Sequence, residues 1–208
     1  MNKAVLRGRQ VARRWSALAA MTLLALLGSG CATHYVDTAT PEVPVTALKK
    51  VAQPKPVQLL FEFQTKGVPN SRATQALKDQ VIDQVKAAGL FSSVADTVAA
   101  GGAILSIRLN NVPLSDDAFS KGFVTGLTFG LAGSQVTDGY VCTIEYLDGT
   151  GTATITKTAR HAIHTVIGAK GAPENAVPAQ NIEAAVRTMT RQIVSTGLRD
   201  LSFDPSFR

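Results

Sequence analysis

The sequence predicts an α+β domain of two layers, in which two helices pack on one face of a mixed sheet of four to five strands. Three patterns support this prediction: alternating apolar residues, apolar residues at helical spacing, and a favoured hairpin turn. They occur at 57–63 and 103–112, at 71–88 and 181–197, and at 148–149. The expected order is strand, helix, short strand, three strands and helix. A hydrophobic content of 45% with 17% charged residues excludes a disordered chain of 208 residues.

The distribution of charge limits the classes of partner. The formal net charge is +6, but residues 1–30 hold five of the 21 basic residues and none of the 15 acidic ones. The remainder therefore has 16 basic and 15 acidic residues and is almost neutral. Nucleic-acid binding requires a basic surface, so we expect no nucleic-acid partner.

Residues 1–30 have the pattern of a signal peptide. A basic stretch ends at Arg14, about a dozen mostly apolar residues follow, and small residues then precede Cys31. The apolar run is shorter than the roughly 20 residues of a stable membrane span. Alternatives are an uncleaved anchor helix, an ordinary signal followed by a chance cysteine, and a twin-arginine signal at Arg13–Arg14.

Residues 26–31, Leu-Leu-Gly-Ser-Gly-Cys, resemble the lipobox of bacterial lipoproteins. The resemblance implies that Cys31 is the lipid attachment site and the first mature residue. It also implies that Ala32 directs the protein to the outer membrane, where the lipid anchor holds it facing the periplasm. Two or more acyl chains give stable attachment, since each buried methylene contributes about 0.8 kcal/mol.

The segment 31–56 is predicted to be a lipidated N-terminus and a flexible tether. It contains four prolines and no helical period. The domains expected are thus a signal peptide at 1–30, this tether, and a periplasmic α+β domain at 57–208. With Cys31 acylated, Cys142 has no partner for an internal disulfide, and its place in a predicted strand favours burial.

The first half of the domain predicts a crossover unit. Alternation along 57–63 predicts a half-buried strand, and Ser71 is a candidate cap for a helix over 71–88. A short strand is expected at 90–94 and a longer one at 103–112. If the strands at 57–63 and 103–112 share a sheet, they should be parallel and connected with right-handed topology.

The second half predicts a hairpin and a closing helix. The turn Asp148–Gly149 would pair Leu147 with Thr150 and Cys142 with Ile155, which gives one apolar face and one threonine-lined face. Apolar residues at helical spacing along 181–197 predict a second helix that covers the sheet.

No catalytic, metal-binding or cofactor-binding constellation is expected. His161 and His164 lie in a predicted strand, where an odd separation places their rings on opposite faces, so they should not share a metal ion. The pair Asp116–Asp117 follows Pro113 and fits loop or cap chemistry. We therefore expect a protein that is not an enzyme and holds no cofactor.

The segment 122–133, GFVTGLTFGLAG, is apolar, uncharged and carries glycines four residues apart. As a helix of twelve residues it would span only about 18 Å, too short to cross a bilayer. It can be a buried loop, a partner-binding patch or a membrane contact. Its candidate contact residues are Phe123, Leu127, Phe129 and Leu131.

The order of elements after the lipobox resembles that of small α+β lipoproteins of proteobacterial envelopes, including curli-secretion and lipopolysaccharide-assembly types. This similarity of architecture implies a non-enzymatic binding or assembly role in the envelope. The partner would be an envelope protein or further copies of the chain, contacted through 122–133. The alternative is a subunit of an oligomeric outer-membrane pore or secretion complex that inserts this segment.

Overall fold

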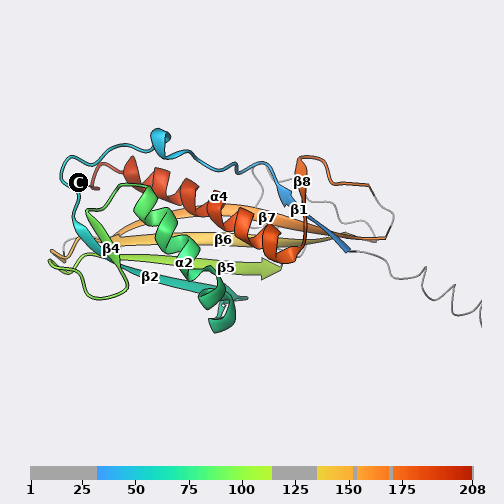
Figure 1. The fold of residues 1–208 in the computed structure, drawn as a ribbon, viewed down its shortest axis with the longest axis horizontal. Coiled ribbons are helices and arrows are strands. Elements are labelled where there is room, and N and C mark those ends of the chain that lie inside the picture. Colours follow the sequence, from blue (N-terminus) through green and yellow to red (C-terminus); the bar gives the residue numbers. More distant parts are fainter. Residues whose placement is uncertain (1–31, 114–134, 152–153, 169–170, 208) are drawn as a thin grey trace, which may run out of the picture.

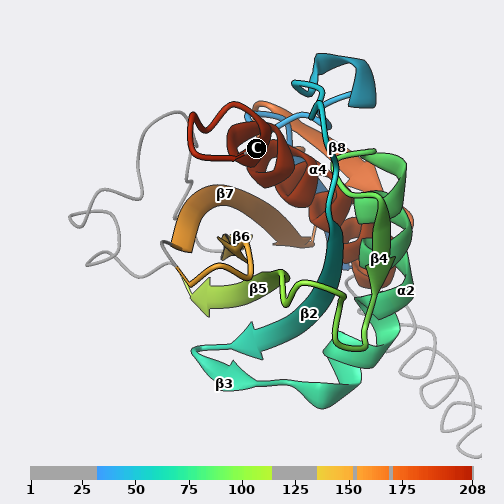
Figure 2. The same ribbon diagram turned by 90° about the vertical axis from the view of Figure 1, so that its left-hand side faces the viewer.

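The computed structural model describes residues 32–113, 135–151, 154–168 and 171–207. Two helices, α2 (Ser71–Ala87) and α4 (Ile182–Ser202), lie on one side of a single sheet, as Figures 1 and 2 show. The expected two-layer α+β class with a mixed sheet is confirmed. The described residues form eight strands instead of four or five, because short edge strands and an N-terminal strand join the sheet.

The strands follow the order β3-β2-β5-β6-β7-β1-β8, and β4 pairs with β2 beside this path. Six of the seven strand pairs in the sheet include at least one of the four long strands β2, β5, β6 and β7. The bounds are β1 Ala32–Asp37, β2 Pro56–Thr65, β3 Val68–Pro69, β4 Ser93–Ala95, β5 Ile104–Pro113, β6 Gln135–Leu147, β7 Thr154–Ile167 and β8 Ala176–Ala179. The only further helical element among the described residues is the 3₁₀ turn Val45–Ala47.

The crossover unit β2-α2-β5 forms as expected, and β2 and β5 are parallel. The helix cap differs by one residue. Asn70, and not Ser71, is the N-cap, because its side-chain oxygen accepts a hydrogen bond from the Ala73 amide at 3.1 Å. Ser71 is the first residue of the helix.

The hairpin β6–β7 forms, but its predicted register is wrong. Leu147 pairs with Thr154 and Cys142 with Ala159, so the loop is four residues longer than a two-residue turn. Asp148 accepts hydrogen bonds from the amide and hydroxyl of Thr150, which folds the chain into a local turn before β7 begins. A shift of four residues is even, so every side chain keeps its predicted face and Cys142 is fully buried as expected.

The segment 32–56 differs from the predicted tether. Its first six residues form β1, which pairs with β7 and β8, and the next residues run along α4 as a strap. The Val43 amide donates to Ser195 Oγ at 2.9 Å and the Lys49 amide donates to Ser202 Oγ at 3.1 Å. Proline favours extended backbone, and the amides between the prolines here bind hydroxyls of α4 in place of water. Residues 32–56 therefore belong to the folded domain, which was predicted to begin at 57.

Helix α4 packs its apolar stripe on the middle of the sheet and extends beyond its predicted end at Gly197. Gly197 is not a cap but a point of close approach, since a Cβ at this position would lie 2.6 Å from Ile144 Cδ1. Met189, Ile193 and Leu201 are fully buried on the same helix. The core between α4 and β6 is thus formed by closely packed apolar side chains.

Candidate functional site at the N-terminal end of the sheet

Three points of the chain that lead to predicted functional segments lie at one end of the sheet. Ala32, which follows Cys31, pairs with Ile167 at the end of β7. Pro113 and Gln135, which flank 114–134, lie in the paired strands β5 and β6 near that end. Figure 1 shows the start of β1 and the paired ends of β6 and β7 on the right.

The predicted site residues themselves, Cys31, Phe123, Leu127, Phe129 and Leu131, lie outside the described residues. Lipidation at Cys31 and contact through 122–133 therefore stay predictions. What the structure adds is the position of the strands from which these segments depart.

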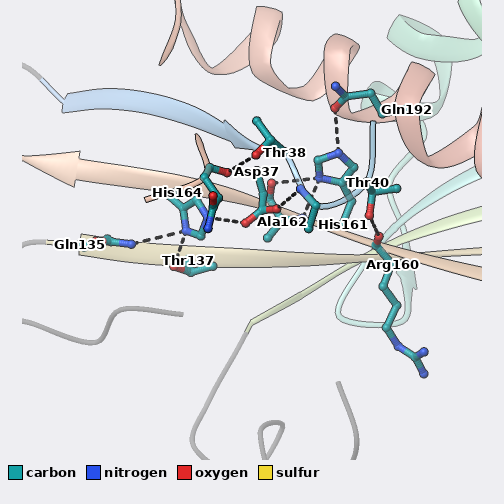
Figure 3. A network of polar contacts seen from close by, with 12 residues as sticks. Asp37, Thr38, Thr40, Gln135, Thr137, Arg160, His161, Ala162, His164 and Gln192 are labelled. Carbon is teal, nitrogen blue, oxygen red and sulfur yellow. Dashed lines mark hydrogen bonds and ion pairs between the residues drawn. The ribbon is translucent and has the colours of Figure 1, made fainter. Parts of the chain in front are cut away.

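A buried polar network joins β1 to the sheet just behind this end (Figure 3). The carboxylate of Asp37, at the end of β1, is 1% exposed and lies with Oδ2 3.2 Å from Nε2 of the fully buried His164. Its other oxygen, Oδ1, accepts a hydrogen bond from the Ala39 amide at 2.7 Å. On the other side of the imidazole, Nδ1 lies 2.9 Å from Thr137 Oγ1 and 3.4 Å from Gln135 Nε2.

These partners fit one tautomer of His164. A carboxylate only accepts hydrogen bonds, so Nε2 of the imidazole carries the proton that it donates to Asp37. Nδ1 is then free to accept hydrogen bonds from the hydroxyl of Thr137 and the amide of Gln135. The three elements β1, β6 and β7 are thereby held together by one side chain.

His161 lies on the opposite face of β7, as the sequence predicts. Its Nε2 lies 2.8 Å from Gln192 Oε1 on α4, and burial lowers the pKa of the imidazole against a smaller raising effect of this hydrogen bond. The neutral ring links α4 to the sheet. Both histidines are fully buried, although they lie on opposite faces of β7.

The arrangement Thr137–His164–Asp37 has the chemical order hydroxyl, imidazole and carboxylate found in nucleophilic relays. In such a relay the hydroxyl and the base must reach a substrate. Here the imidazole is fully buried and both of its nitrogens have side-chain partners. This geometry favours a structural role, in which the contacts fix β1 to the sheet, and disfavours proton transfer.

No group of three or more metal-binding side chains occurs in the part of the chain that the structure describes. The thiol of Cys142 is also unsuited to chemistry there, because complete burial raises its pKa to about 12. The pair Asp116–Asp117 lies outside the described residues.

A surface groove of about 380 Å³ lies where the strap crosses the two helices. Its floor is polar as well as apolar: Gln80 and Gln84 of α2 donate to the backbone oxygens of Arg187 and Arg191 at 2.9 and 2.7 Å. The ion pair of Glu42 with Arg191 lies beside it. These contacts fasten the strap and the helices to one another.

Sequence reasoning missed Asp37, because the segment that carries it was expected to be a tether. The partners Asp37 and His164 are 127 residues apart, so no local pattern joins them. The β-branched and aromatic residues Thr33, Tyr35 and Val36, which favour strands, are the local sign that a strand begins here.

Comparisons with known proteins give distant matches to solved structures. No protein-family model matches the sequence, and no curated protein matches it. Among solved structures, the chain is similar to the PelC dodecamer from Paraburkholderia phytofirmans, seen in two crystal forms. The identity is 13%, the match covers 82% of this chain and 97% of that chain, and the TM-score is 0.35.

A second similar structure is described as a "putative lipoprotein" from Caulobacter crescentus CB15. It is 12% identical, the match covers 77% of this chain and 88% of that chain, and the TM-score is 0.24. Likenesses of this size do not assign a function to the chain. Within its described residues, neither helix is long and apolar enough to span a membrane.

Proposed function

We propose that the protein is a lipid-anchored protein of the bacterial cell envelope with a non-enzymatic binding or assembly role. Cys31 carries the acyl chains, and the α+β domain faces the periplasm from the outer membrane. The segment 122–133 is the surface that contacts an envelope partner.

The observation that carries this proposal is the position of Ala32. The residue after the candidate lipidation site is the first residue of a sheet strand, paired with Ile167. An acyl anchor on Cys31 therefore acts on the folded domain directly, with no spacer between them. The strands that flank 114–134 reach Pro113 and Gln135 near the same end of the sheet, which supports a common location for the anchor and the contact segment in this proposal.

A binding role agrees better than catalysis with the polar groups that are described. The two histidines of β7 are fully buried with side-chain partners, and the thiol of Cys142 is held protonated by burial. An apolar surface without charge suits contact with a protein or a membrane.

The partner role is tested by photo-crosslinkers placed in cells at Phe123 and Phe129, with exposed Val45 and Val98 as control positions. We expect one specific protein to be captured from 123 and 129 and not from the controls. Equal capture at all four positions, or none at 123 and 129, contradicts the partner role. The native mass of the detergent-extracted protein distinguishes a monomer from a ring of copies.

A further inference from the structure

The end of the sheet where β1 begins exposes a row of apolar side chains. Ile167 is 51% exposed and Val136 is 53% exposed, and Ala32 is exposed beside them. Ala32 lies opposite Ile167, while Val136 lies opposite Thr165, two residues before Ile167 on the same face. The three residues Ala32, Val136 and Ile167 thus share one face and form what we name the β1-end patch.

The strand ends that form the β1-end patch carry no charged side chain other than histidine. Residues 32–36, 135–137 and 163–168 include no aspartate, glutamate, lysine or arginine. Moving charged groups out of water is costly, whereas apolar groups gain from leaving it. These strand ends can therefore approach a lipid head-group region without desolvating a charge of their own.

Covalent geometry places the candidate anchor next to the patch. Consecutive Cα atoms are about 3.8 Å apart, so the Cα atom of Cys31 lies at this distance from that of Ala32 in the patch. Its acyl chains hold that end of β1 at the membrane surface, and β1 is fixed to the sheet by its pairing with β7 and by the Asp37–His164 contact. A rigid connection of this kind orients the domain instead of leaving it free to rotate.

We propose that the β1-end patch is a lipid-contacting surface, on which the domain sits with the long strands β6 and β7 pointing away from the bilayer. This inference rests on the proposed lipid anchor and adds to it one fixed orientation. The occupant is the bilayer, because the anchored residue adjoins the patch and because the patch is apolar and uncharged.

The opposite end of the sheet supplies a matched control. Val98 is 81% exposed and lies in the loop between β4 and β5, where Ile104 pairs with Leu147. The 14 residues of β7 separate the two ends by about 40 Å at roughly 3.3 Å per residue. Val98 should therefore stay in water when Ile167 contacts lipid.

Tryptophan fluorescence can test this orientation. The single tryptophan, Trp15, lies in the predicted signal peptide, so the mature protein should contain none. The variants Ile167→Trp, Val136→Trp and Val98→Trp are purified in lipidated form and reconstituted into phosphatidylcholine vesicles with and without brominated acyl chains. Bromine quenches only tryptophans that contact the lipid.

We expect brominated lipid to quench at least half of the fluorescence of Ile167→Trp and Val136→Trp, and to leave that of Val98→Trp within a tenth of its unbrominated value. If the lipidated protein floats with the vesicles but all three variants are quenched equally or not at all, the orientation is overturned while the anchor stands. If the protein carries no acyl groups and does not float, the proposed function and the orientation both fail.

Discussion

The contact between Asp37 and His164 should contribute strongly to folding, and His164→Ala tests it. The substitution leaves the buried Asp37 carboxylate with the hydrogen bond from the Ala39 amide but without its imidazole partner. Breaking a buried charged contact in this way costs about 3–5 kcal/mol, out of a total stability of roughly 5–15 kcal/mol for a domain. We expect urea unfolding of the chain from residue 32 onward to show a loss of about 3 kcal/mol or more.

Asp37→Asn should cost less, about 1 kcal/mol. The imidazole can move its proton to Nδ1 and donate to Thr137 Oγ1, and its Nε2 can then accept a hydrogen bond from the asparagine amide. The double variant, which combines His164→Ala with Asp37→Asn, leaves no carboxylate unpaired. Its loss of unfolding free energy should therefore be smaller than the sum of the two single losses by about 1–3 kcal/mol. Additive losses, or a loss below about 1 kcal/mol for His164→Ala, would refute this reasoning.

A matched control lies on the same strand. His34 is partly buried with Nδ1 3.0 Å from Thr165 Oγ1, and within the described residues it forms no ion pair with a carboxylate. His34→Ala should cost only about 1 kcal/mol, the usual value of one such hydrogen bond. A loss as large as that of His164→Ala would mean that β1 depends on histidine contacts in general and not on the buried carboxylate.

Three further results are expected. Burial lowers the pKa of His161 below its ordinary 6.5, so the unfolded chain binds more protons than the folded one as pH falls below about 6.5. The contribution of the neutral ring to the free energy of unfolding should therefore be present in full above this pH and be lost below it. In urea unfolding at a series of pH values, His161→Gln should reduce this loss. Gly149→Ala should destabilise by several kcal/mol more than Gly151→Ala in thermal unfolding: both glycines have positive φ, but only at 149 would the new Cβ meet a backbone oxygen, that of Gly101. Cys142 should resist iodoacetamide at pH 8 in the folded protein and react after unfolding in urea, as intact mass would show; rapid labelling of the folded protein would contradict the burial that raises its pKa to about 12.

The two helices and the long strands from residue 57 onward could be predicted because their evidence is local, whereas the short strands β3 and β8 were not predicted. The helical spacing of Leu77, Val81 and Val85 gave α2, and these three side chains are buried in the structure. The alternation on either side of the hairpin gave β6 and β7 with their correct faces. Its register was wrong because the Asp148 side chain binds Thr150 in a local turn, and β7 begins only at Thr154.

The N-terminal strand could not be predicted with the same rules. Its six residues are too few for a strong period, and its partners in β7 lie some 130 residues away. The prolines that follow it are typical of linkers, but here they belong to a strap held by Ser195 and Ser202. The contact of Asp37 with His164 depends on this non-local pairing, so the candidate site could not be assembled from the sequence.

The mass of the N-terminal peptide of the mature protein, extracted from membranes with detergent, tests the proposed anchor most directly. We predict a peptide that begins at Cys31 and carries acyl groups, and a Cys31→Ser variant that loses both the acyl mass and its sedimentation with membranes. A peptide that begins at another residue, or an unmodified Cys31 in a protein still bound to membranes, would contradict the proposed function.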